Sequence, residues 1–207
     1  MPVTEQLPER ASLPHTPSFG WRLYVLFAIC LFFVFPLHES AHYLTYHALG
    51  VHVRMTLNTA SPADQSQRRA IAEFAGPLLN LALASGCVLA YYHMGRGRVL
   101  WAAMGLAASM MRLVIYAIIL GAAIVTGSGM TTGNDEPIAA RLLGLPSLTF
   151  VLALTPPFVF IVWLLLRTFR GGGTLRKCLN VLGLAFLTLC IGMLVGNVLD
   201  PWLFPSR

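Results

Sequence analysis

The chain has 207 residues, of which 57% are hydrophobic and 11% charged, and its formal net charge is +6. Soluble globular proteins devote about 25% of their residues to charged side chains, so this chain is too apolar to cover a water-exposed surface. A soluble enzyme, a disordered chain and a nucleic-acid binder are therefore disfavoured, and an all-α polytopic membrane bundle is predicted.

The chain divides into a tail and one membrane domain. Residues 1–20 hold four prolines among polar residues and lack the pattern of a signal peptide, which predicts a flexible N-terminal tail. Residues 21–207 show no second domain. About five transmembrane helices are expected from the apolar segments of this part, which are long enough to cross a bilayer: 23–50, 71–93, 99–125, 148–166 and 179–199.

The first span must include polar residues. No charge occurs over 23–37, but fifteen residues of helix rise only about 22 Å, less than the roughly 30 Å of a hydrocarbon core. The polar cluster that follows therefore lies inside the bilayer or at its edge. It contains His38, Glu39 and His42.

These three residues form an H-E-x-x-H motif. Residues four apart share one face of a helix, so His38 and His42 can converge on one zinc ion. Glu39 then points to the adjacent edge, where its carboxylate can take a proton from a water without occupying the metal. The structural alternative is a polar helix end whose histidines only form hydrogen bonds at the membrane–water interface. We expect both histidines to face the bundle interior, because unpaired imidazoles have no stable place in lipid. His47 and His52 are interpreted as interfacial.

The second and third spans carry isolated polar residues. Gly76 and Pro77 permit close helix packing or a kink, and Asn80 follows one turn later. Arg112 lies at the middle of the third span, where a guanidinium is costly unless it faces the bundle and is paired. We expect an inward-facing Arg112, with Glu73 as the first choice of partner.

A catalytic zinc ion takes three protein ligands, so one acid is sought beside the two histidines. Asp135 lies between the third and fourth spans in a segment too polar to cross, and its chain can dip toward the bundle. Asp200, at the end of the fifth span, is the alternative. Glu136 is expected to point elsewhere if a helix starts here. Helix capping by Asn134 or Asp135 before Pro137 explains the acid about equally well.

Three segments carry a resemblance to a known family. Residues 38–53, HESAHYLTYHALGVHV, resemble the H-E-x-x-H followed by L-G-V of the site-2 protease type of intramembrane zinc metallopeptidase. Residues 69–84, RAIAEFAGPLLNLALA, are similar to that family's second core segment. Residues 134–146, NDEPIAARLLGLP, resemble the aspartate-bearing segment of its small, compact bacterial members. The N-x-x-P-x-x-x-D-G pattern of larger members is missing, and the chain has no room for a PDZ domain.

The resemblance covers about residues 21–166, which it marks as the metallopeptidase core. It implies a multi-pass protein of the bacterial inner membrane that hydrolyses peptide bonds in or near transmembrane segments of substrate proteins. It favours Asp135 as the third zinc ligand, beside His38 and His42, with Glu39 as the catalytic base. It also places Asn80 near the scissile peptide, where a plain interhelical hydrogen bond is the alternative.

Two other classes stay open from the sequence. One is a zinc-binding membrane protein without proteolytic activity, in which the motif holds metal but no substrate enters. The other is a metal transporter, which predicts further intramembrane acids and histidines along a path. The oligomeric state has no signature in the sequence.

Overall fold

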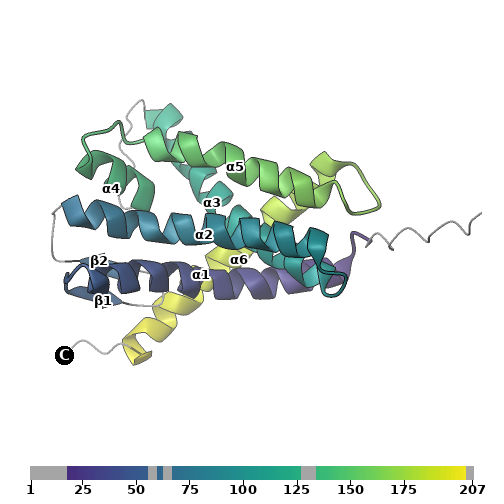
Figure 1. Cartoon of the computed structure of the whole chain (residues 1–207), viewed down its shortest axis with the longest axis horizontal. Helices are drawn as coiled ribbons and strands as arrows, with labels where there is room; N and C mark the ends of the chain where they lie inside the picture. Colours follow the sequence, from purple (N-terminus) through teal and green to yellow (C-terminus); the bar gives the residue numbers. More distant parts are fainter. Residues whose placement is uncertain (1–17, 56–59, 63–66, 127–133, 204–207) are drawn as a thin grey trace, which may run out of the picture.

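The computed structural model describes residues 18–55, 60–62, 67–126 and 134–203, so most of the predicted tail lies outside the described residues. In this part the chain forms one helical bundle with a short two-stranded sheet (Figure 1). In chain order its elements are α1 (Trp21–Ala48), β1 (Val53–Met55), β2 (Ala60–Pro62), α2 (Gln67–His93), α3 (Arg98–Thr126), α4 (Asp135–Leu142), α5 (Thr149–Leu166) and α6 (Thr174–Leu203).

Five of these helices are long and apolar enough to cross a membrane, namely α1, α2, α3, α5 and α6. The predicted all-α polytopic bundle is therefore confirmed, and the spans lie where hydrophobicity places them. Helix α1 is unbroken through the polar cluster, and its 28 residues rise about 42 Å. The H-E-x-x-H motif thus lies within a helix that is longer than the hydrocarbon core is thick.

The polar link after α1 contains a small antiparallel sheet. Val53 of β1 pairs with Pro62 of β2, and Met55 pairs with Ala60. The sheet lies beside the C-terminal end of α1, and α2 then returns along α1 (Figure 1). The chain reversal at this end places the start of α2 next to the histidine motif.

Helix α3 is the centre of the bundle, because it packs against α1, α2, α5 and α6. Small side chains make this close packing possible, as is common between helices in membranes. A Cβ atom on Gly105 would lie 3.1 Å from the Cβ atom of Cys87 in α2. The other small buried residues of α3 are Ala102, Ala103, Ala107, Ala108 and Ser109.

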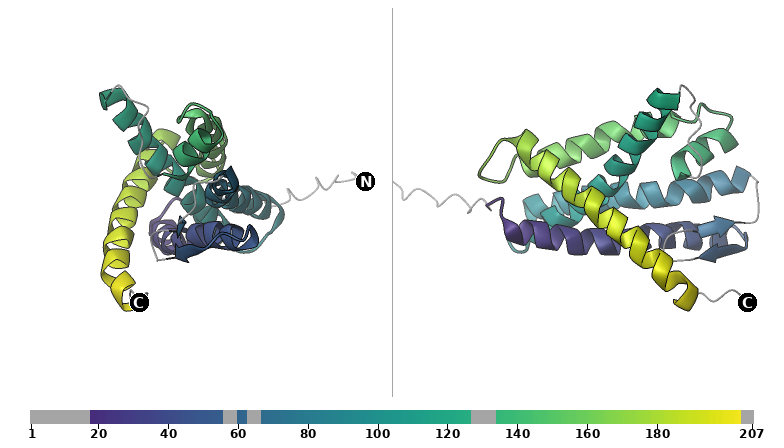
Figure 2. Two further views of the ribbon diagram at one scale, coloured as in Figure 1. Left: turned by 90° about the vertical axis from the view of Figure 1, so that its left-hand side faces the viewer. Right: turned by 180° about the vertical axis from the view of Figure 1, so that it is seen from behind.

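Helix α6 lies on the outside of the bundle and crosses it obliquely, as the view from behind shows (Figure 2). Only a small part of its surface is covered by other helices. Most of its exposed side chains are apolar, which suits contact with lipid. They include Leu179, Phe186, Leu187, Ile191, Leu194 and Val198.

Helix α4 is too short to cross a membrane and packs against α2 and α5. It lies beside the first turns of α2, at the end of the bundle that holds the small sheet (Figure 1). Its first residue, Asp135, is brought in this way to the C-terminal half of α1.

Candidate metal centre

Two imidazoles of α1 face one another inside the bundle. The residues His38 and His42 are one helical turn apart and only 1% and 2% exposed. Their Nε2 atoms are 3.1 Å apart, and their rings are nearly perpendicular, at 83°. The inward orientation expected from the sequence is present.

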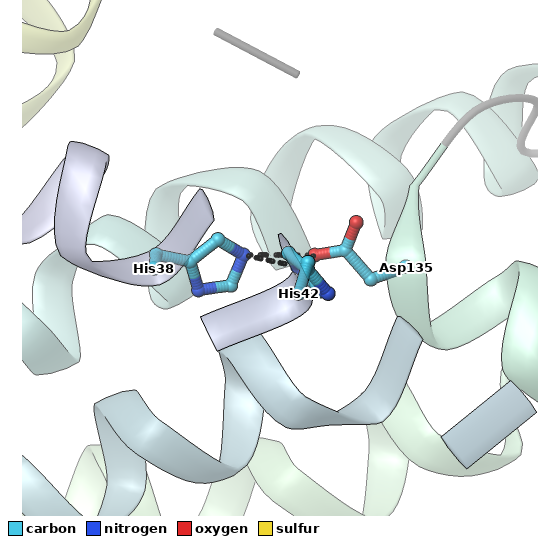
Figure 3. A group of neighbouring side chains, drawn as sticks. All are labelled: His38, His42 and Asp135. Carbon is cyan, nitrogen blue, oxygen red and sulfur yellow. Dashed lines mark hydrogen bonds and ion pairs between the residues drawn. The ribbon is translucent and has the colours of Figure 1, made fainter. Parts of the chain in front are cut away.

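The carboxylate of Asp135 completes a group of three converging side chains (Figure 3). Its Oδ2 atom is 3.0 Å from Nε2 of His38 and 3.4 Å from Nε2 of His42. The expected approach of Asp135 to both histidines is therefore observed, although 97 positions separate it from His38. Asn134 precedes α4 and makes no capping hydrogen bond with its side chain.

The backbone of α2 fixes the orientation of one imidazole. The Nδ1 atom of His42 lies 2.7 Å from the carbonyl oxygen of Ala72. Because a carbonyl oxygen only accepts, Nδ1 carries the hydrogen and donates it. A neutral His42 then has its lone pair on Nε2, toward His38 and Asp135. This tautomer is the one that binds a metal through Nε2.

Gly76 allows α2 to pass directly over the histidines. A Cβ atom at this position would lie 2.4 Å from Nε2 of His42 and 2.5 Å from Cε1 of His38. Contacts this short do not occur between real atoms, so only glycine fits. The sequence suggested close packing at Gly76, but not that the histidines are what it packs against.

Arg112 of α3 lies beside the same three side chains and is 2% exposed. Its Nη1 atom is 3.2 Å from Oδ2 of Asp135 and 3.2 Å from Nε2 of His38. Its Nη2 atom donates to Oε2 of Glu136, and the hydroxyl of Tyr116 donates to the other oxygen of Glu136. The expected inward orientation and acidic partner are correct.

The predicted pairing of Arg112 with Glu73 is wrong. Oε1 of Glu73 accepts a hydrogen bond of 2.8 Å from Nε of Arg69 in α2 and one of 2.7 Å from the hydroxyl of Tyr46 in α1. Arg69, four residues before Glu73 on the same helix, thus pairs with the Glu73 carboxylate. Helix α4 supplies the acids that Arg112 contacts instead.

Sequence reasoning missed the roles of Glu136 and Tyr116. Glu136 is fully buried, and its carboxylate accepts hydrogen bonds from Arg112 and Tyr116 rather than joining the three converging groups, in agreement with the expectation that it points elsewhere. Tyr116 follows Arg112 by four residues on α3, and the guanidinium carbon lies 5.4 Å from the centre of its ring. The spacing of Arg112 and Tyr116 was the one available signal, since residues four apart share a helix face.

Glu39 lies between the two histidines in sequence and is 9% exposed. It is close enough to His42 and Asp135 to interact with both electrostatically. Its position on α1 is the adjacent edge expected from the spacing of the motif. The cluster therefore has a carboxylate at its side that is not one of its three converging groups.

Asn80 is buried between α2 and α3, four residues after Gly76 and hence on the same face of α2. Its Nδ2 atom donates to Sδ of Met111 over 3.5 Å. Its Oδ1 atom has no hydrogen-bond partner among the described residues. The interhelical hydrogen bond expected as the alternative role is present, and it engages only the Nδ2 group of the amide.

The remaining candidates do not join the cluster in the part of the chain that the structure describes. His47 and His52 are exposed, as expected for interfacial residues. The side chain of Asp200, the alternative third ligand, lies outside the described residues.

Asp135 lies in α4, outside the five apolar helices, and its carboxyl is strongly influenced by its neighbours. Burial by itself raises its pKa. Hydrogen bonds with His38 and His42 and the positive charge of Arg112 outweigh burial and hold the pKa of Asp135 well below its usual range. Asp135 is therefore ionised at neutral pH, as a metal ligand must be.

Within the described residues, one group of three or more histidine, cysteine or acidic side chains has the geometry of a metal site: His38, His42 and Asp135. Each offers a single ligand atom, and these atoms lie within 4.8 Å of one another. Comparison with protein-family models, curated proteins and solved structures finds no match to this chain.

Proposed function

We propose that this chain is a membrane-embedded zinc metalloendopeptidase. The observation that carries the proposal is the convergence of two imidazoles and a carboxylate inside a bundle of apolar helices, with Glu39 beside them. The resemblance of the three sequence segments to site-2 proteases points to the same chemistry. It also supports the proposal that the protein lies in the inner membrane of a bacterium.

The spacing of the three ligand atoms fits zinc. Tetrahedral zinc binds nitrogen and oxygen at about 2.0–2.1 Å, which separates any two ligand atoms by about 3.3 Å. The three separations among His38, His42 and Asp135 are 3.1, 3.0 and 3.4 Å. Three protein ligands leave the fourth position of a tetrahedron open, which is the pattern of catalytic zinc sites.

The charge around the site also fits a divalent cation. Four carboxylates and two guanidiniums lie in or beside the cluster, so acidic side chains outnumber basic ones there. A bound divalent cation would pair with the excess carboxylates, and buried acids need such a partner. The six residues are Glu39, Glu73, Asp135, Glu136, Arg69 and Arg112.

In the proposed reaction, Glu39 is the general base and acid. Bound zinc would polarise the substrate carbonyl and lower the pKa of a water molecule to about 7. Glu39 accepts the proton of the attacking water and returns it to the amine that leaves. The Ala72 carbonyl keeps the Nδ1 hydrogen of His42 in place throughout. Glu39 therefore moves the proton while the histidines and Asp135 hold the metal.

The location of the site points to a membrane-protein substrate. His38 and His42 lie on a spanning helix and are buried among other helices. A peptide bond in a transmembrane helix has its carbonyl hydrogen-bonded within the helix, so a substrate must partly unwind before attack. We therefore infer that the substrates are peptide bonds in or near transmembrane segments.

Substitution of Glu39 by glutamine tests the proposal. Membrane proteomes of cells that express the wild type or Glu39→Gln are compared for new protein N-termini, and zinc is measured in both purified proteins. We expect the new termini to disappear while zinc stays bound. Glu9→Gln, which changes an acid before α1, serves as the control and keeps the termini.

Different outcomes favour the other two classes. Zinc binding by the wild type without any new termini would indicate a non-proteolytic zinc-binding protein. Zinc uptake into vesicles that persists in Glu39→Gln would indicate a transporter. Unchanged proteolysis by Glu39→Gln would contradict the assigned role of Glu39.

A further inference from the structure

We propose that Arg112 is a positioning residue of the metal centre, which anchors α4 through Glu136 and thereby holds the carboxylate of Asp135 against the two histidines. The inference rests on the proposed zinc site. It assigns a task to three buried residues that the reaction itself does not use, Arg112, Tyr116 and Glu136.

The guanidinium of Arg112 bridges two consecutive acids. Nη1 is 3.2 Å from Oδ2 of Asp135, the same oxygen that faces both imidazoles. Nη2 donates to Oε2 of Glu136, and Tyr116 donates to Oε1. Both oxygens of Glu136 are thus engaged from α3, and one oxygen of Asp135 is directed toward the histidines.

Helix α4 needs such an anchor. It has eight residues, and helices of this length are marginal without tertiary contacts. Asp135 and Glu136 form its first turn, so two side chains from one rigid spanning helix fix the end of α4 that carries the ligand. The guanidinium has a planar fork that can hold two carboxylates at once, which an ammonium group cannot reproduce.

Metal binding would leave this bridge in place. Nε2 of His38 has a single lone pair, so it cannot serve Arg112 and a metal ion together. The carboxylate of Asp135 has several acceptor positions and can serve both. We therefore expect Arg112 to lose its contact with His38 on zinc binding and to keep its contacts with Asp135 and Glu136.

A purely charge-balancing role for Arg112 is the competing explanation. In that case Arg112 only neutralises Glu136, and removal of both charges together would leave the zinc site intact. The double variant Arg112→Gln/Glu136→Gln separates the two explanations, because it removes one positive and one negative charge together and so keeps the net charge, but it also removes the bridge to Asp135.

The experiment measures zinc affinity of the purified full-length protein by competition with a chromophoric chelator. The d–d absorption of the cobalt-substituted protein reports the ligand geometry independently of activity. Loss of residues that orient metal ligands lowers affinity about 10- to 100-fold, and we expect this loss in Arg112→Gln and in the double variant, with an altered cobalt spectrum. Arg112→Lys is expected to recover part of the affinity.

Wild-type affinity and an unchanged cobalt spectrum in the double variant would overturn the inference and leave the proposed zinc site standing. If Arg112→Gln does not fold, the double variant and Arg112→Lys carry the test, with thermal unfolding recorded for each. Failure of the wild type to bind zinc would instead overturn the proposed function, and the inference with it.

Discussion

Gly76 of α2 lies so close to His42 of α1 that a Cβ atom at position 76 would be 2.4 Å from Nε2 of the imidazole. The position of this proposed ligand atom therefore depends on how closely α2 approaches α1. The same stretch of α2 supplies the Ala72 carbonyl that orients His42. Helix α2 thus shapes the site without contributing a ligand.

Gly76→Ala is expected to abolish or strongly weaken zinc binding. The added methyl group must displace His38 and His42, and overpacking of this kind typically costs about 1–3 kcal/mol. Gly86→Ala is the matched control on the same helix, since a Cβ atom there meets nothing within 4 Å. Zinc content and thermal unfolding of both proteins check the prediction. Equal zinc affinity in the two variants would show that the close approach does not matter.

His38→Ala and His42→Ala are each expected to lose bound zinc, because two protein ligands do not hold a catalytic zinc ion. His47→Ala is the control, since His47 is exposed and lies on the same helix. The zinc-to-protein ratio after gel filtration provides the measurement. Zinc that stays bound to His38→Ala would move the site elsewhere in the chain.

The third ligand is tested by comparing Asp135→Ala with Asp200→Ala. The carboxylate of Asp135 lies beside both imidazoles, so its removal should weaken zinc binding by more than about 100-fold. This loss is larger than the one expected when a residue that only orients a ligand is removed. Asp200→Ala should bind zinc like the wild type. The reverse result would assign the ligand to α6.

Asn80→Ala and Met111→Leu distinguish the two roles considered for Asn80. Met111→Leu keeps the volume but removes the sulfur that accepts the hydrogen bond from Asn80. If Asn80 holds the substrate backbone, Asn80→Ala lowers proteolysis about tenfold, the loss of one hydrogen bond, while Met111→Leu does not. We expect this outcome, with zinc retained in both. Equal losses in the two variants would show that the interhelical contact alone matters.

The helices could be predicted because the bilayer imposes a simple rule. An apolar run of sufficient length must form a helix that satisfies its own backbone, and the observed α3, Arg98–Thr126, departs by one residue at each end from the predicted 99–125. The spacing of His38 and His42 likewise implies a shared helix face. These predictions use only local geometry, which the sequence contains.

The partners of Arg112 could not be predicted in the same way. Which acid reaches Arg112 depends on how α4 packs, and no local rule places a short helix beside a distant span. Glu73 was one possible partner because it is an acid within a predicted span. Its carboxylate instead accepts hydrogen bonds from Arg69 and Tyr46. The location of Asp135 was predicted chiefly through the resemblance, since helix capping explained the same residue about equally well.

The most direct test of the central claim is metal-dependent cleavage by the purified protein. Wild-type protein is reconstituted with membrane proteins in vesicles, stripped with a zinc chelator and then given zinc again, while new protein N-termini are counted. We predict that cleavage stops on removal of zinc and returns with it, and that His42→Ala does not recover. Cleavage that continues without zinc, or its absence from a protein that has bound one zinc ion, would contradict the account.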